Sequence, residues 1–217
     1  MAYPTVSAPY GLQPINLIGG QVFAGATRQL PITPTIGNGG GSINYNTPIY
    51  YGDVVQLSQA NSTIIVSTLD TDTSAVPGVV GVFLGCTYTN PVTKQKTFSQ
   101  YWPGFASGVT DAYAYVADDP DQLYKAASVG NTVNTTGLVI SAVSQVVVGN
   151  NATLILNTGS ATTGNSKIGV FANAVSTPLP MRVVDGIPDT ATSNGYTELV
   201  VKFNFGYHSY NNADGVA

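Results

Sequence analysis

The sequence predicts an all-β protein: a small barrel or sandwich with an extended N-terminal arm and a second β unit towards the C-terminus. Three observations predict it. Glycine and proline interrupt the chain every few residues, with 24 glycines and 13 prolines among 217 residues. β-branched and aromatic residues, which favour strands, fill the intervals. No amphipathic run is long enough for a substantial helix.

The first 48 residues are predicted to form the arm. They contain six prolines and the run GNGGG at residues 37–41. Because each proline removes a donor from a sheet ladder, this segment can supply only short edge strands. We therefore expect the arm to find its surface on another protein and not to pack as core.

Residues 49–117 are predicted to form the barrel or sandwich core. Turn signals every 8 to 12 residues separate five strands in about 70 residues, the spacing of a small all-β unit. The strand candidates are IYYGDVVQLS, STIIVSTL, VPGVVGVFLGCTYT, TKQKTFSQYW and TDAYAYVAD. Glycines 78, 81 and 85 interrupt the third candidate and predict a bulge or a bend in that strand.

Residues 118–217 are predicted to form a C-terminal β unit that packs on the core or continues it. The clearest alternation lies in ELVVKFNF, where every second residue from Leu199 to Phe205 is apolar. It predicts a strand with one buried face and one solvent-exposed face, and Glu198 lies on the solvent-exposed face.

The segment YVADDPDQLYKAA, residues 115–127, places Asp118, Asp119 and Asp121 within four positions of one another. Three such carboxylates can hold a divalent cation, act as an acid and base pair, or open a helix. Pro120 is favoured at the first position of a helix, and Asp119 is then its N-cap. The sequence therefore predicts one short helix near residues 119–128 and no metal, and leaves Asp118 without a role.

Charge is unusually scarce. Charged residues make up 8% of the chain, against about 25% in average globular domains. A polar surface with little charge favours close packing of many copies in an ordered assembly. The net charge of −4 and the scattered basic residues argue against nucleic-acid binding. No apolar run approaches the ~18 residues of a membrane span, and no signal peptide is evident, so we expect cytoplasmic synthesis.

The inventory of reactive residues argues against an enzyme. The chain has one histidine, His208, and one cysteine, Cys86, which lies inside an apolar strand. There is no G-x-S-x-G motif, and glutamate occurs only at position 198. A nucleophile–base pair or a carboxylate pair would therefore need residues far apart in sequence. We expect no catalytic residues and no cofactor.

Thirteen tyrosines and the single tryptophan are the other notable feature. Aromatic residues beside amides and glycines are typical of protein interfaces and of sugar-binding faces, and large rings also fill narrow cores. Core or protein interface is the preferred interpretation, with glycan contact as the alternative. The candidate interface aromatics are Tyr101, Trp102, Phe105, Tyr207 and Tyr210.

Several segments carry a resemblance. The run YGDVVQLS, the strand TIIV and the stretch GVVGVFLGCTYTNP resemble the head decoration (cement) proteins of tailed bacteriophages. Residues 3–20, 98–103 and 115–124 are similar to segments of virion structural proteins of marine and cyanobacterial phages. The similarity covers most of the chain and includes no catalytic signature.

The resemblance implies a non-enzymatic protein on the outer surface of the capsid, often trimeric, that clamps neighbouring major capsid subunits. It implies a homotrimer whose partners are the major capsid protein and its own copies. The alternative function is a fibre or glycan-binding module on a virion surface. On this resemblance the arm is the capsid contact, and its expected contact residues are Tyr3, Tyr10, Ile15, Leu17, Ile18, Val22 and Phe23.

Overall fold

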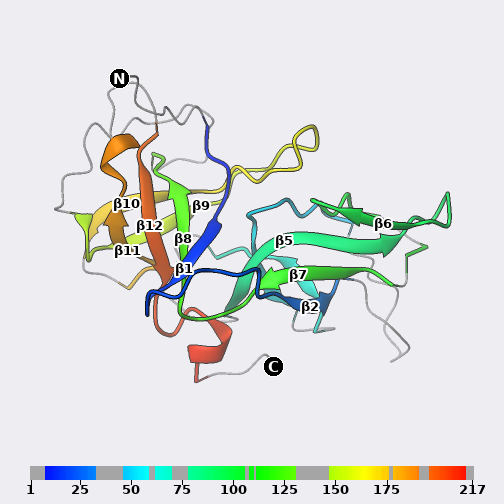
Figure 1. Cartoon of the computed structure of the whole chain (residues 1–217), viewed down its shortest axis with the longest axis horizontal. Coiled ribbons are helices and arrows are strands. Elements are labelled where there is room, and N and C mark those ends of the chain that lie inside the picture. The colour runs from blue at the N-terminus through cyan, green and yellow to red at the C-terminus, as the bar shows by residue number, and fades with distance from the viewer. Residues whose placement is uncertain are drawn as a thin grey trace.

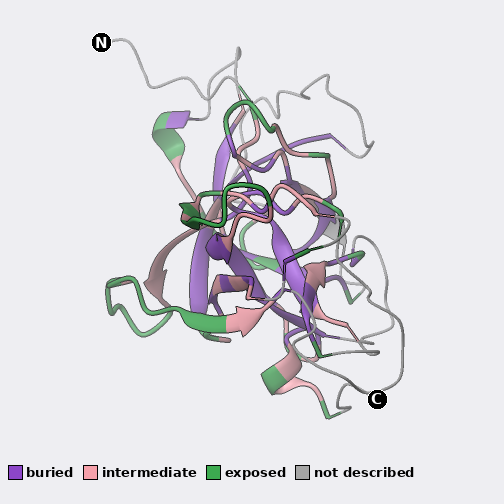
Figure 2. Ribbon diagram, turned by 90° about the vertical axis from the view of Figure 1, so that its right-hand side faces the viewer, coloured by how far each residue is buried: buried purple, intermediate pink, exposed green. Residues whose placement is uncertain are grey.

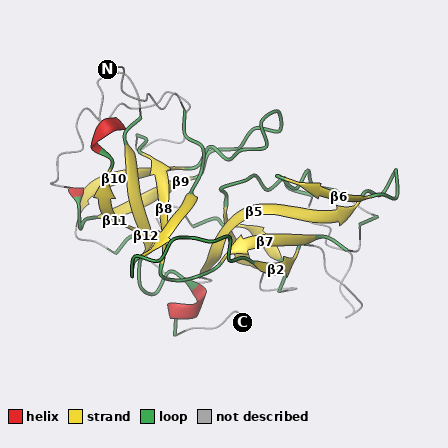
Figure 3. Cartoon of the chain, in the orientation of Figure 1, coloured by secondary structure: helices red, strands yellow, loops and turns green. Residues whose placement is uncertain are grey.

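The computed structural model confirms the all-β prediction. It describes residues 8–32, 46–58, 62–69, 78–105, 108–109, 111–130, 147–175, 178–190 and 196–213. These residues form two antiparallel sheets that do not close into a barrel and are consistent with a β-sandwich (Figure 3). Among these residues, helical structure occurs in short 3₁₀ turns, including η2 (Pro188–Thr190) and η3 (Ser209–Asn211). No helix of the described residues is long and apolar enough to cross a membrane.

The first sheet, sheet A, contains the C-terminal strands and one strand from the N-terminal segment (Figure 1). In spatial order its strands are β1 (Gln13–Leu17), β8 (Gln122–Ala127), β12 (Glu198–Phe203), β11 (Met181–Gly186), β9 (Asn151–Ile155) and β10 (Gly169–Val175). The alternation predicted for residues 199–205 holds only to Phe203, which is buried. The strand ends there, and Phe205 lies in the following turn with 86% of its surface exposed.

The second sheet, sheet B, contains all five strand candidates of residues 49–117. In spatial order its strands are β2 (Arg28–Pro31), β7 (Tyr113–Ala117), β5 (Val79–Thr89), β3 (Val54–Leu57) and β4 (Ile64–Val66), and β6 (Lys96–Ser99) also pairs with β5. The pairing of β5 with β7 shifts register between Phe83 and Gly85, and Gly85 has φ +141. The glycine-rich third candidate therefore carries the irregularity predicted for it.

The helix predicted near residues 119–128 is wrong. Residues 122–127 form β8, which pairs with β1 on one side and β12 on the other. The acidic residues before it form a tight turn, with Asp119 in the first position and Pro120 in the second, a position that proline also favours. Two neighbouring strands thus satisfy the backbone of a segment with good helix propensity, so tertiary context overrides local preference.

The N-terminal segment also differs from its expectation. Its described strands, β1 and β2, are short and lie at sheet edges, as its prolines require. However, both pair within this chain, and Leu12 and Ile32 have no exposed surface. The expectation that the segment packs on another protein and not on its own core is therefore wrong for these residues. Tyr3 lies outside the described residues.

One hydrophobic core joins the two sheets. Valines 54, 79 and 82 of sheet B pack in the same cluster as Leu154, Val183 and Val201 of sheet A. A second cluster lies on the other face of sheet B and includes Val55, Phe83 and Trp102. Figure 2 shows the buried residues concentrated along the strands. Because the first cluster draws on both sheets, the C-terminal half is built onto the same core as residues 49–117. The chain passes from sheet A to sheet B between β1 and β2, and returns to sheet A at residues 118–121.

Candidate interaction site

The three aspartates of the acidic segment lie in the connection between β7 and β8, and each has a different role. The backbone N–H of Gln122 donates to the carbonyl of Asp119 over 3.1 Å, which closes the turn. The carboxylate oxygen Oδ1 of Asp119 accepts from the N–H of Asp121 over 2.8 Å. This is the turn chemistry of an Asx residue, and it replaces the helix N-cap predicted for Asp119.

Two of these aspartates are paired with cations. Asp118 accepts from Nε of Arg28 and from the hydroxyl of Tyr210, each over 2.8 Å. The guanidinium of Arg28 also lies over the Tyr210 ring, 5.3 Å from its centroid. Asp118, to which the sequence pattern assigned no role, therefore joins β2, the end of β7 and η3. Asp121 accepts from Nζ of Lys202 over 2.6 Å. Asp119 has no cationic partner among the described residues.

The predicted contact residues of the N-terminal segment fall into two groups. Tyr10, Ile15, Leu17 and Phe23 are partly buried, and the Tyr10 hydroxyl donates to Oε1 of Glu198 over 2.6 Å. Glu198 was predicted on a solvent-exposed face, but it is only 8% exposed and also pairs with Lys125. In contrast, Ile18 and Val22 are 54% and 78% exposed.

The exposed pair lies on a turn that folds back along β1. The N–H of Leu17 donates to the carbonyl of Gln21, and the N–H of Phe23 donates to the carbonyl of Ile15. Gly20 has φ +86, a conformation that glycine adopts without strain. These contacts cover the outer edge of β1 and leave Ile18 and Val22 exposed. We call residues 18–26 the β1 turn.

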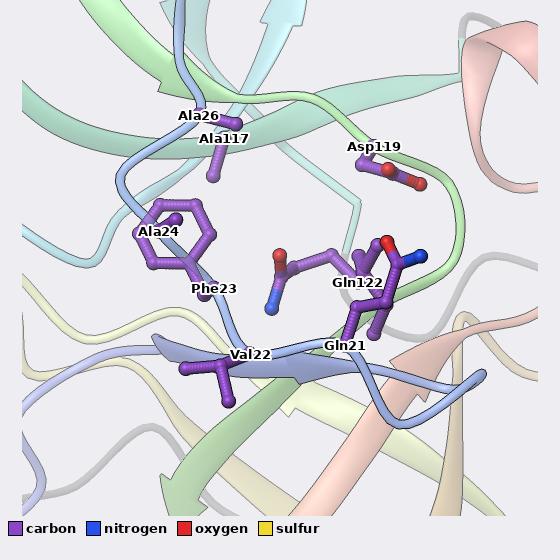
Figure 4. A pocket seen from close by; sticks show the side chains of 9 residues that line it. Gln21, Val22, Phe23, Ala24, Ala26, Ala117, Asp119 and Gln122 are labelled. Carbon is purple, nitrogen blue, oxygen red and sulfur yellow. The ribbon is translucent and has the colours of Figure 1, made fainter.

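A cavity of about 200 Å³ lies between the β1 turn and the β7–β8 connection (Figure 4). Its polar lining is formed by Gln21, Asp119 and Gln122. Its apolar walls are Leu17, Val22, Phe23, Ala24, Ala26 and Ala117.

The five candidate interface aromatics differ in exposure. Trp102 has no exposed surface, and Tyr207 is 4% exposed. Phe105 packs partly buried beside Trp102 with its ring centroid 5.3 Å away, and Tyr101 stacks on Tyr50. Tyr210 is 46% exposed. Trp102 and Tyr207 are therefore core residues, and neither offers a face to a partner or a sugar.

The three most exposed apolar residues outside the β1 turn were not predicted from the sequence. Phe98 on β6 is 75% exposed, Val92 in the β5–β6 turn is 85% exposed, and Phe205 is 86% exposed. Figure 1 shows the β5–β6 hairpin projecting from sheet B. A usable signal was the position of Phe98 in TKQKTFSQ, where polar neighbours on both sides leave no apolar face for it to join. For Phe205 the signal was Gly206, which ends the alternating pattern.

The reactive residues do not meet in one place. His208 is fully buried, its Nδ1 accepts from the N–H of Tyr210, and burial is the main cause that lowers its pKa. Burial raises the pKa of the Cys86 thiol to about 12. No group of three or more His, Cys, Asp or Glu side chains placed to hold a metal ion occurs among the described residues.

Asp53 is the most deeply buried carboxyl group with a shifted pKa. It is 4% exposed, and its Oδ2 accepts from the N–H of Tyr50 over 2.8 Å. Ser166, from the sheet A side, hydrogen-bonds to it. Burial, the largest cause, raises the pKa of Asp53 from 3.8 to about 6, and the two hydrogen bonds oppose that rise. The group therefore lies where the two sheets meet, beside a second cavity of about 250 Å³.

This shift predicts that stability falls as pH rises through the pKa of Asp53. Between pH 4 and 6 the folded state binds the proton more tightly than the unfolded state, so the stabilisation is present below pH 4 and lost above pH 6. The full loss is about 3 kcal/mol of unfolding free energy. Urea unfolding at pH 4.5 and 7.5 should show about 2 kcal/mol of this loss, because part of it has already occurred at pH 4.5. Asp53→Asn should remove most of the difference in unfolding free energy between the two pH values. If that difference were unchanged in the variant, other titrating groups would be its cause.

No protein family model matches the chain, and no curated protein or solved structure was found to be significantly similar to it.

Proposed function

We propose that the chain is a non-enzymatic virion structural protein that binds the outer surface of a phage capsid and stabilises it by clamping neighbouring major capsid subunits. Its partners in this proposal are the major capsid protein and other copies of itself, as a homotrimer. The observation that carries the proposal is the exposed pair Ile18 and Val22, which a hydrogen-bonded turn holds out from the molecule.

The β1 turn is a suitable contact because it loses little conformational entropy on binding. Its backbone is already fixed against β1, so burial of Ile18 and Val22 is opposed by less conformational entropy than the binding of a free arm. Full burial of one such side chain contributes about 1.5–3 kcal/mol. Many symmetry-related copies on one shell would multiply that modest affinity.

A clamp needs a second contact, and the β5–β6 hairpin supplies a candidate. Val92 and Phe98 lie on this hairpin, which projects at the end of the long axis away from sheet A (Figure 1). Exposed apolar residues at two separated places would allow one molecule to contact two neighbouring subunits. Scarce surface charge supports the same role, because it limits repulsion between crowded copies.

The alternative, a glycan-binding module, has less support. Its strongest candidate residue was Trp102, whose ring has no exposed surface. The ring of Tyr210 is engaged by Arg28 on one side and by His208, at a centroid distance of 5.1 Å. Strong sugar binding on a glycan array would restore this alternative.

The proposal is tested by thermal rupture of capsids. Purified protein is added to expanded capsids that lack decoration, and release of the packaged DNA is followed as temperature rises. We expect the rupture temperature to increase with added protein until the sites saturate. A rupture temperature that is unchanged at saturating protein would contradict the stabilising role.

A further inference from the structure

We propose that the cavity between the β1 turn and the β7–β8 connection binds the side chain of a lysine from a partner protein. The methylene stem would lie against the apolar walls, and the ammonium group would donate to Asp119 and Gln122. Only the identity of the partner as a capsid subunit rests on the proposed function.

Gln122 presents a hydrogen-bond acceptor to the cavity. The residue is 1% exposed, and its Nε2 donates to the carbonyls of Asn16 and Leu123 over 3.0 and 2.8 Å. Because both contacts are acceptors, they fix the orientation of the amide. Oε1 then faces the other way, into the space beside Phe23 (Figure 4). Among the described residues, the hydrogen bonds of the Gln122 side chain run through Nε2, which leaves Oε1 to accept from a ligand in the cavity.

Asp119 presents negative charge at the rim of the same cavity. Its Oδ1 accepts from the N–H of Asp121, which leaves Oδ2 free to accept from a ligand. The neighbouring aspartates are neutralised by Arg28 and Lys202, but within the described part of the chain no lysine or arginine pairs with Asp119. The rim therefore carries an unbalanced negative charge beside the Oε1 acceptor of Gln122.

The size and walls of the cavity fit one unbranched side chain. At about 200 Å³ it is smaller than the roughly 300–1,000 Å³ typical of small-molecule sites. The walls include Phe23, Ala24 and Ala117, which offer apolar surface but no further charge. Lysine buries its methylene stem on apolar surface and keeps its charge at the edge, which is the arrangement this cavity offers.

Other ligands fit less well. A carboxylate or phosphate would be repelled by Asp119. A calcium ion takes 6–8 oxygen ligands, and the cavity is lined by three side chains that carry oxygen, Gln21, Asp119 and Gln122. Arginine has five donors in a rigid fork, which the few acceptors of separate residues around this cavity would not match in geometry. The compact ammonium of lysine needs fewer acceptors and can keep water on its remaining donor.

The test uses n-butylammonium as the probe, because it reproduces the end of a lysine side chain. Its titration into the ¹⁵N-labelled full chain is followed by NMR. We expect saturable shifts at the Gln122 side-chain amide and at the backbone of Asp119, with Kd on the order of 1–10 mM for so small a ligand. Butan-1-ol, which has the same stem without the charge, should bind at least about fivefold more weakly.

Three variants locate the site. Asp119→Asn keeps the Oδ1 acceptor of the turn and should weaken butylammonium binding about fivefold. Asp121→Asn removes the same charge outside the cavity and should leave binding unchanged. Ala26→Leu adds bulk at an exposed position on the rim and should block the probe. Equal binding of butanol and butylammonium, or equal effects of the two aspartate variants, would overturn the proposal.

The outcome is separable from that of the capsid experiment. If the probe does not bind but capsids are stabilised, the lysine site is wrong and the proposed function stands. If the probe binds as expected but the capsids do not respond, the site stands and its partner is a different protein.

Discussion

Trp102→Ala is expected to lower the free energy of unfolding by about 3–5 kcal/mol, because it removes a large ring from a packed core. Trp102 is fully buried, and its ring contacts Tyr88 and Phe105 at centroid distances of 5.3 Å with near-perpendicular geometry. Its backbone also exchanges two hydrogen bonds with Ile49. Removal of the indole would leave a cavity in the cluster on the outer face of sheet B.

Urea unfolding followed by circular dichroism measures this loss, and Phe98→Ala is the matched control. Phe98 lies four residues earlier and is 75% exposed, so its truncation should change stability by no more than about 0.5 kcal/mol. Comparable losses in the two variants would contradict the burial described for Trp102, and would return its ring to the candidates for an exposed binding face.

Gly81→Ala is expected to cost about 3 kcal/mol for the opposite reason, overpacking. A Cβ at position 81 would lie 2.1 Å from the carbonyl oxygen of Ala117, in the neighbouring strand β7. The obstructing atom belongs to the backbone, so no side chain can move aside. β5 and β7 would have to separate where Val82 pairs with Ala117.

Gly19→Ala is the control for this prediction. A Cβ at position 19 meets no atom within 4 Å, and Gly19 does not have positive φ. That variant should unfold at nearly the same urea concentration as the parent, whereas Gly81→Ala should unfold at a much lower one. A tolerated Gly81→Ala would show that the two strands approach less closely at this point.

The strands of sheet B were predictable because their signals are local. Glycine, proline and asparagine mark the turns, and β-branched residues fill the intervals, so each candidate segment from Ile49 to Ala117 contains a strand. Their assignment to one sheet, and the pairing of β3 and β6 with different parts of β5, depends on contacts between distant residues. No pattern within a single window contains that information.

The errors share a physical cause, because each concerned a residue whose environment is set by distant segments. Asp119-Pro120 suits a helix start and a β-turn equally well, and the positions of β1 and β12 decide between them. Trp102 lies beside Pro103-Gly104, which is typical of an exposed loop, yet its bridge to Ile49 places it in the core. Likewise β1 and β2 find partners more than eighty residues away.

Only part of the candidate site was predictable from the sequence, because only part of it depends on local signals. Ile18 and Val22 were identified as apolar residues in a segment with few strand positions, and both are exposed. The cavity beside them was not predictable, because Gln122 and Ala117 come from strands β8 and β7 and reach it only through the pairing of both sheets.

Co-sedimentation with undecorated capsids tests the central claim, that the β1 turn is the capsid contact. The parent chain is compared with the double variant Ile18→Asp, Val22→Asp and with Val148→Asp, which places a single aspartate at another exposed valine. We predict that the parent and Val148→Asp pellet with the capsids, and that the double variant, folded by circular dichroism, stays in the supernatant. If all three proteins pelleted equally with the capsids, or if none of them pelleted, the claim would be contradicted.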